Sequence, residues 1–265
     1  MAHAARTRNP QAGRVANIRN QLEEKEMMTH DGILHAAQRY QEDDSSILRW
    51  GGLAGIGGSV LLVVVFALVA IFAGPEPAGL AGPISRFPEI RVARTVENGL
   101  YLAALALWVL LALALFRTLR RTRPASALFG SALNIFGLAV LAAGAIPHVV
   151  TSRLSDLYHA DGVRPDDQAT LVLLWQANQA MFDALLLVGL LVMPVGVILF
   201  GVAMRQDPAF GKVAGNVSVA LGVVGLAAAT VMLVDPLSAV AAVGIFALIG
   251  FHLVAGWKTY RLSTA

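Results

Sequence analysis

Seven polar residues have types and positions that could form a binding site, and the most unusual of them is Asp183. It is the only acidic residue well inside a membrane-length apolar run, which extends from Leu171 to Met204. At about 3.6 residues per helical turn, Gln176, Gln179 and Asp183 fall on one side of a helix. Lipid cannot form hydrogen bonds with such a stripe, so it is expected to face protein or a water-filled cavity.

The other four polar residues are predicted at the same ends of their apolar segments, and they are Glu97, Asn98, His148 and Asp235. If the segments pack as one bundle, the seven residues converge on a polar pocket in which Asp183 and His148 respond to protons. The alternative is that the ends of membrane helices are wet and that these groups only satisfy one another. The sequence leaves both interpretations open.

Motifs of known catalytic and cofactor chemistry do not appear in the sequence. The absence of Cys excludes disulfides, thiolate metal sites and a cysteine nucleophile. The chain also lacks a phosphate-binding Gly loop, a zinc-protease helix and a nucleophile elbow. His148 and His252 are predicted at different depths, so they are not expected to share a haem. We therefore expect no catalytic residue, no metal and no cofactor, and an enzyme is the least favoured class of function.

The composition is that of a protein embedded in lipid. Of the 265 residues, 57% are hydrophobic and 14% are charged, and the mean hydropathy is +0.66. Soluble domains carry about 25% charged residues. The net charge is +3, but most basic residues lie beside apolar segments, where they orient a membrane protein. The lipid bilayer is therefore the expected partner, and nucleic acid is not.

Six apolar segments are long enough to cross a bilayer, which predicts an all-α fold, a polytopic membrane bundle of six transmembrane helices. The predicted spans are 51–72, 98–116, 125–147, 180–204, 214–234 and 237–257, the fourth being the membrane part of one long protruding helix. Residues 1–47 form a polar arm, residues 48–257 the transmembrane domain and residues 258–265 a short tail. In the arm, apolar spacing predicts a short amphipathic helix between Val15 and Tyr40, and the change in composition at Met27 suggests a later start of translation as a hypothesis.

Two stretches between spans are predicted to be loops. Residues 74–96 contain four prolines and three glycines, which favour a loop over a continuous helix. Residues 151–167 are hydrophilic and contain Asp156, His159 and Asp161. These residue types could bind a metal, but they lack a tight ligand spacing, so an ordinary polar loop is favoured.

The distribution of Lys and Arg predicts how the chain lies in the membrane. Six spans place both termini on one side, and fifteen of the 20 Lys and Arg residues lie on that side. Basic residues favour the cytoplasmic side of membrane proteins. Both termini are therefore predicted to be cytoplasmic, and the seven polar residues are predicted near the outer surface.

Three parts of the chain carry a resemblance to a known family: the run RTVENGLYLAALALWVLLALALFRTLRR, the helix around Asn178 to Asp183, and the passage LFGVAMRQDPAFGKVAGNVSVALGVVGLAAA. They resemble a family of six-span bacterial membrane proteins, the domain-of-unknown-function group 4386. In that family a glutamate opens the second span, a place taken here by Glu97. A short basic loop with an aromatic residue precedes a Gly-rich fifth span, and here that loop contains Phe210, Gly211 and Lys212. The resemblance covers about residues 48–257 and implies a multi-pass protein of the bacterial inner membrane, without an activity.

Three classes of function remain open, and two of them are favoured over an enzyme. The first is a non-enzymatic membrane component that packs with lipids, with a second copy of the chain or with another membrane protein. Gly51 and Gly55 support it, because small residues four positions apart let membrane helices approach closely. The second is a carrier or sensor of a small ligand, with an outward-facing polar pocket around Asp183 and His148. The lack of a catalytic motif and the small-residue spacing favour the first.

Overall fold

The computed structural model describes residues 44–74, 77–235 and 240–264. By its internal contacts, the bundle forms one compact unit, Ile47–Ala265. The described residues are mostly helical, and none of them forms a strand. The helix and the translation start predicted for the polar arm lie outside the described residues. The prediction of an all-α fold is confirmed.

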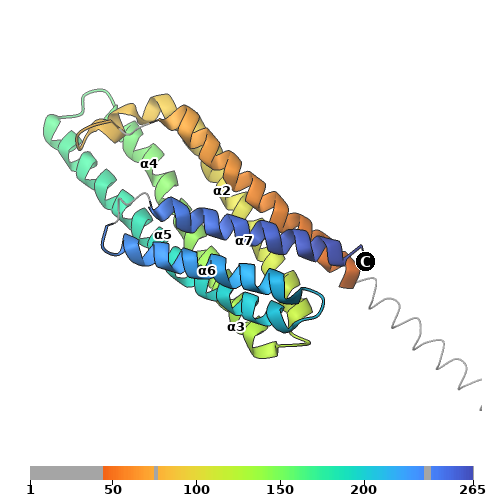
Figure 1. Cartoon of the computed structure of the whole chain (residues 1–265). Helices are drawn as coiled ribbons and strands as arrows, with labels where there is room; N and C mark the ends of the chain where they lie inside the picture. The colour runs from red at the N-terminus through yellow and green to blue at the C-terminus, as the bar shows by residue number, and fades with distance from the viewer. Residues whose placement is uncertain (1–43, 75–76, 236–239, 265) are drawn as a thin grey trace, which may run out of the picture. The chain divides into compact units, whose positions relative to one another are not determined.

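Six helices in the described part of the chain are long and apolar enough to cross a membrane, as predicted. The first is Asp44–Phe72, and its end continues into the π-helical turn η1 (Val69–Ala73). The others, labelled in Figure 1, are α2 (Gly82–Leu119), α3 (Pro124–Ala143) continued by α4 (Ala145–Tyr158), α5 (Pro165–Gln206), α6 (Gly211–Met232) and α7 (Val240–Leu262). α7 reaches beyond the predicted sixth span, so most of the predicted tail is helical.

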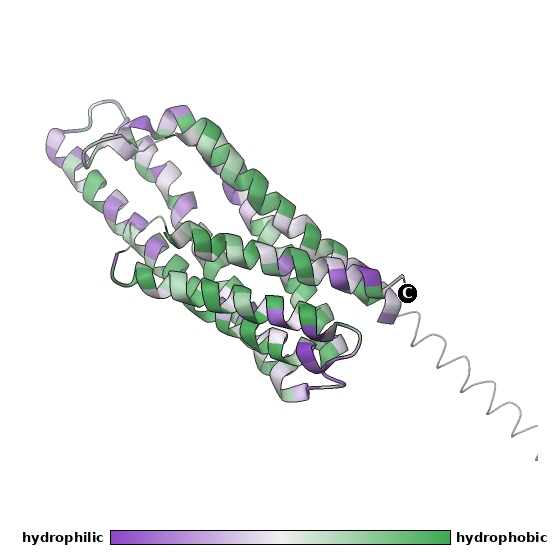
Figure 2. Ribbon diagram, viewed as in Figure 1, coloured by the Kyte–Doolittle hydropathy of each residue, from purple (hydrophilic) through white to green (hydrophobic). Residues whose placement is uncertain are grey.

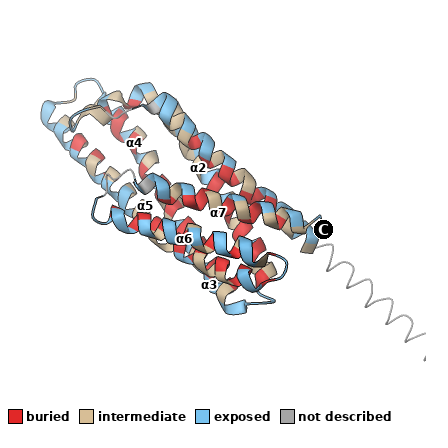
Figure 3. Cartoon of the chain, viewed as in Figure 1, coloured by how far each residue is buried: buried red, intermediate tan, exposed pale blue. Residues whose placement is uncertain are grey.

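The middle of the bundle has an apolar surface. Hydrophobic residues cover the helices there, and polar residues gather toward the ends (Figure 2). Large apolar side chains such as Leu110, Phe136 and Val223 are about half exposed. Exposed positions recur along all the helices (Figure 3). Apolar surface of this extent indicates contact with lipid. The chain is a multi-pass membrane protein.

Glycines bring α3, α5 and α6 into backbone contact. A Cβ atom at Gly196 of α5 would lie 2.9 Å from the backbone N of Asn134 and from the O of Gly130, both in α3. A Cβ atom at Gly201 would lie 2.7 Å from the backbone N of Val219 in α6. Only glycine fits at these two positions, because backbone atoms cannot move aside as a flexible side chain can.

The small-residue pair of the first helix makes the close contact that its spacing predicts. Gly51 packs against Ala114, and a Cβ atom at Gly55 would lie 2.6 Å from Leu111 Cδ2, so both glycines contact α2. Between them, Gly52 faces the backbone of Tyr260 in α7. The contact therefore joins helices of one chain. It also shows that the first helix starts where α7 ends, and we call this end of the bundle the terminal end.

α2, α4 and α5 protrude at the opposite end. α2 and α5 have 38 and 42 residues, or about 57 and 63 Å, which is about twice the thickness of the hydrocarbon layer. The prediction of one long helix over α5 is confirmed. Beyond the bundle, the three helices share a small core made of Ile84, Phe87, Leu154, Val172 and Trp175. We call α4 and residues 82–97 and 165–179 the protruding end, which Figure 1 shows away from the C-terminus.

The predicted loop over residues 74–96 is wrong from Gly82 onward, because α2 begins there and continues through Pro88. Pro83 lies in the first turn, where a missing N–H costs no helical hydrogen bond. Pro88 leaves the carbonyl of Ile84 without its helical donor. Ser155 Oγ of α4 donates to that carbonyl at 3.5 Å, so a neighbouring helix replaces the missing bond.

The predicted loop over residues 151–167 is wrong for its first half. α4 continues to Tyr158, so only residues 159–164 connect it to α5. Thr151 and Ser155, which look like loop residues in the sequence, are buried against the other helices. Leu154 belongs to the core of the protruding end, which stabilises this helix. The break between α3 and α4 lies earlier, at Gly144.

Candidate functional site

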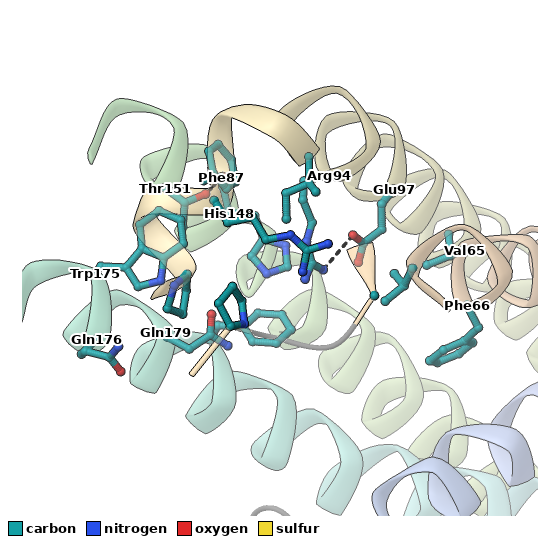
Figure 4. A pocket seen from close by; sticks show the side chains of 17 residues that line it. Val65, Phe66, Phe87, Arg94, Glu97, His148, Thr151, Trp175, Gln176 and Gln179 are labelled. Carbon is teal, nitrogen blue, oxygen red and sulfur yellow. Dashed lines mark hydrogen bonds and ion pairs between the residues drawn. The ribbon is translucent and has the colours of Figure 1, made fainter. Parts of the chain in front are cut away.

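A cavity of about 290 Å³ lies where the transmembrane bundle meets the protruding end (Figure 4). Its size is close to the lower end of the range for pockets that bind drug-sized molecules, about 300–1,000 Å³. The first helix and its η1 turn, α2, α4 and α5 all contribute to its wall. Its polar and charged lining residues are Arg86, Arg94, Glu97, His148, Thr151, Gln176 and Gln179. We call this cavity the polar chamber.

An ion pair on α2 forms part of the wall. Arg94 and Glu97 are three residues apart and therefore neighbours on the helix surface. Arg94 Nη1 donates to Glu97 Oε2 at 3.0 Å, and the two side chains are only 28% and 14% exposed. Figure 4 shows the guanidinium group of Arg94 between Glu97 and the ring of His148. The pair holds one positive and one negative group at the same side of the chamber.

His148 lies on α4 and is held by contacts with α5. Its ring stacks on Phe182, with 4.5 Å between ring centroids and 27° between planes. Next to it, the carbonyl of Pro147 accepts a hydrogen bond of 2.8 Å from Asn178 Nδ2, which ties the start of α4 to α5. The hydroxyl of Thr151 donates to the His148 carbonyl at 2.6 Å. The ring is therefore fixed beside the chamber.

A second cavity of about 170 Å³ adjoins the first and is mostly apolar. The two cavities share the wall residues Val65, Phe66, Glu97, His148 and Phe182. Along α2 the second cavity continues from Glu97 to Trp108, a rise of about 16 Å toward the middle of the bundle. Its apolar lining includes Leu62, Leu105, Leu141, Leu186, Leu190, Ile245 and Leu248. We call it the apolar chamber.

Polar groups in the apolar chamber lie mainly close to the polar chamber. The hydroxyl of Tyr101 donates to the carbonyl of Leu141 at 3.1 Å. Asn98 Oδ1 is buried without a hydrogen-bond partner. Deeper in the bundle, the indole ring of Trp108 stacks on the buried ring of His252, with 3.7 Å between centroids. An occupant would therefore meet polar groups at one end of the apolar chamber and ring and hydrocarbon surface over the rest.

The structure brings together five of the seven residues singled out in the sequence. Four of them line the polar chamber, namely Glu97, His148, Gln176 and Gln179. Asn98 lines the apolar chamber, as Glu97 and His148 also do. These placements make the five residues candidates for ligand contact.

Asp183 and Asp235 line neither chamber. Asp183 is exposed and accepts a hydrogen bond of 3.1 Å from Gln179 Nε2. Its neighbour Phe182 occupies the inward position on α5, and a helix turns the next residue away by about 100°. Asp235 is exposed after the end of α6.

Several residues that line the polar chamber were not predicted as site residues from the sequence. Arg86, Phe87 and Arg94 fall in the stretch predicted to be a loop, and Thr151 falls in the second predicted loop, so none of them was assigned to a site. A signal was nevertheless present, because Arg94 and Glu97 have the spacing of an ion pair on one helix face. Trp175 was not singled out because an aromatic residue in an apolar run is ordinary.

The side chains of the site suit binding better than metal chemistry. Among the described residues, no three His, Asp or Glu side chains are grouped so that they could hold a metal ion. Asp156, from the stretch considered for a metal, forms an ion pair with Arg91 of α2. His159 of the same stretch contacts the carbonyl of Ser155 through Nδ1.

The comparisons with known proteins yield no relative. No family model matches the chain, and neither a curated protein nor a solved structure is significantly similar to it. The resemblance to the six-span family therefore stays a prediction, and the account of the site depends on its geometry.

Proposed function

We propose that the chain binds a small amphiphilic molecule and acts as its carrier or sensor in the membrane. The main support is the continuity of the two chambers, in which one wall leads from charged and polar groups to hydrocarbon and ring surface. Ligand sites in proteins are commonly apolar cavities with a few placed polar groups. A molecule with a polar head and an apolar body matches this order of surfaces.

The other function considered is a component that packs with lipids or partners, and one observation that favoured it no longer does so. Gly51 and Gly55 suggested contact with a partner, but they pack against α2 of the same chain. The apolar outer surface needs only lipid as its cover. This function remains a prediction, and ligand binding is favoured by the chambers.

We further propose that the chain lies in a bacterial inner membrane with both termini in the cytoplasm. The support is the excess of Lys and Arg on the side of the termini, together with the resemblance to the six-span family. In this orientation the polar chamber faces the outer side. A ligand would then enter from the periplasmic surface or from the outer leaflet.

Native mass spectrometry tests the proposal on the full chain in a neutral detergent. Three probes that each carry a twelve-carbon chain, dodecanoate, dodecyltrimethylammonium and dodecanol, are added separately. We expect at least one of them to form a one-to-one adduct. The Leu105→Trp variant should lose it, because the larger side chain fills the apolar chamber, where Leu105 is only 3% exposed.

The matched control is Leu102→Trp, which adds the same side chain to α2 at a position that is 38% exposed and outside both chambers. This variant should keep the adduct. Absence of a one-to-one adduct with all three probes would contradict the proposal. So would equal binding by the folded Leu105→Trp and Leu102→Trp variants.

A further inference from the structure

We propose that the ligand is an anionic amphiphile, whose acid group binds Arg94 in the polar chamber while its apolar part fills the apolar chamber. This inference rests on the proposed function and names the class of ligand. The first support is the charged part of the lining, in which two of the three charged residues are arginines, Arg86 and Arg94, and the third is Glu97. Guanidinium groups form strong hydrogen bonds with acid groups.

The geometry of Arg94 is the second support. Its ion pair with Glu97 uses Nη1, and a guanidinium group has five N–H donors on three nitrogens. The Arg94 side chain is 28% exposed, and Figure 4 shows its guanidinium group directed into the chamber. Arginine binds carboxylate and phosphate groups through two parallel hydrogen bonds, which are stronger than those between neutral groups. Arg94 can therefore bind an acid group while keeping its contact with Glu97.

Glu97 has a specific part in this arrangement. It anchors Arg94 at the junction of the two chambers, since Glu97 lines both of them and Arg94 lines the first. An acid group bound to Arg94 would lie near the Glu97 carboxylate, and the two negative charges would repel each other. Glu97 thus positions the arginine and weakens the binding of an anion. Removing its charge should strengthen binding of an anion and weaken binding of a cation.

The position of Arg94 relative to the apolar chamber is the third support. Arg94 precedes Glu97 by one helical turn, and the residues that follow on α2 line the apolar chamber down to Trp108. An acid group held at Arg94 therefore leaves the attached apolar part at the open end of that chamber. Phe66 and Phe182 line both chambers and would cover the part of the ligand that passes between them.

The three probes of the previous experiment distinguish the classes of ligand. For the native chain, dodecanoate should bind at least about tenfold more tightly than dodecyltrimethylammonium and dodecanol. The Arg94→Gln variant should bind dodecanoate about tenfold more weakly. The Glu97→Gln variant should bind it several-fold more tightly, a gain that simple damage to the fold would not produce.

Arg91→Gln is the matched control. Arg91 lies one turn from Arg94 on α2, lines neither chamber, and pairs with Asp156 at a partly exposed position. Its replacement should change dodecanoate binding by less than about twofold, because Arg91 lines neither chamber and its partly exposed charge is screened by solvent. Thermal unfolding of each variant verifies that it is folded.

The outcomes separate this inference from the proposed function. Tighter binding of dodecyltrimethylammonium, lost in Glu97→Gln, would overturn the anionic class and leave ligand binding in the chambers intact. Equal binding of all three probes, or unchanged dodecanoate binding in a folded Arg94→Gln variant, would also overturn it. Absence of binding by every probe would contradict the proposed function itself.

Discussion

The contacts of α5 with α3 and α6 and the walls of the two chambers are made from different kinds of residue. In the first region, glycines such as Gly196 and Gly201 bring backbones together and leave no room for a side chain. In the second, bulky and charged residues such as Phe66, Phe182 and Arg94 line open volume between the helices. The same helix, α5, takes part in both. A helix bundle can therefore be tightly packed in one region and contain cavities in another, according to the size of the residues on each helix face.

This comparison predicts its largest effect at Gly196. Leucine there would push α5 away from the backbone of Asn134 and Gly130, so the Gly196→Leu variant should lose more than about 3 kcal/mol of stability. Thermal unfolding in detergent measures the loss. Gly99→Leu in α2 is the control, because a Cβ atom at Gly99 meets no other atom within 4 Å. Equal unfolding temperatures of the two variants would refute the close contact.

A loss of similar size but local extent is expected at the protruding end. Trp175 packs edge-on against Phe87 with 5.3 Å between ring centroids, in the small core formed by α2, α4 and α5. The Trp175→Ala variant should destabilise this core by about 3 kcal/mol. Hydrogen exchange should then become faster in α4 and residues 165–179 and stay slow in α6 and α7.

Trp257→Ala provides the comparison for that experiment. Trp257 is 56% exposed at the terminal end, so its removal should leave hydrogen exchange at the protruding end unchanged. Faster exchange throughout the bundle in Trp175→Ala would mean that the two cores unfold as one unit, which would contradict a separate core at the protruding end.

The smallest effect concerns the hydrogen bond that supports the helix at Pro88. Ser155→Ala removes the donor to the Ile84 carbonyl, at a long distance of 3.5 Å, so the expected cost is about 0.5 kcal/mol. The first turns of α2 should exchange hydrogen several-fold faster as a result. Thr95→Ala is a suitable control, because its hydroxyl donates to the Arg91 carbonyl within α2 and not to Ile84. Identical exchange in the two variants would remove the role assigned to Ser155.

The sequence could predict the six spans, because an apolar run of sufficient length is a local property. It could also predict the close approach at Gly51 and Gly55 and the long α5 helix. It could not predict that α2 starts at Gly82, since the prolines argue for a loop unless Ser155 of another helix replaces a missing donor. Because the stretch that contains Arg94 was predicted to be a loop, Arg94 was not predicted as a site residue.

For the candidate site too, the sequence predicts a local pattern but not how the helices pack against one another. The spacing of Gln176, Gln179 and Asp183 places them on one side of α5, and Gln176 and Gln179 line the polar chamber. Whether the next turn continues into the chamber depends on how α5 is rotated against its neighbours. Phe182 takes the inward position and Asp183 is exposed, a result of packing that periodicity alone does not fix.

The central claim, that the chambers bind an amphiphile with its polar head in the polar chamber, is tested most directly by protection of a single cysteine. The chain contains no Cys, so a Gln179→Cys variant carries one reactive thiol in the chamber wall. Its labelling by a membrane-impermeant maleimide is timed with and without dodecanoate. The control variant is Thr170→Cys, at an exposed position of α5 that lines neither chamber. We expect dodecanoate to slow labelling several-fold at position 179 and to leave position 170 unchanged. Equal labelling rates at position 179 with and without saturating dodecanoate would contradict the account.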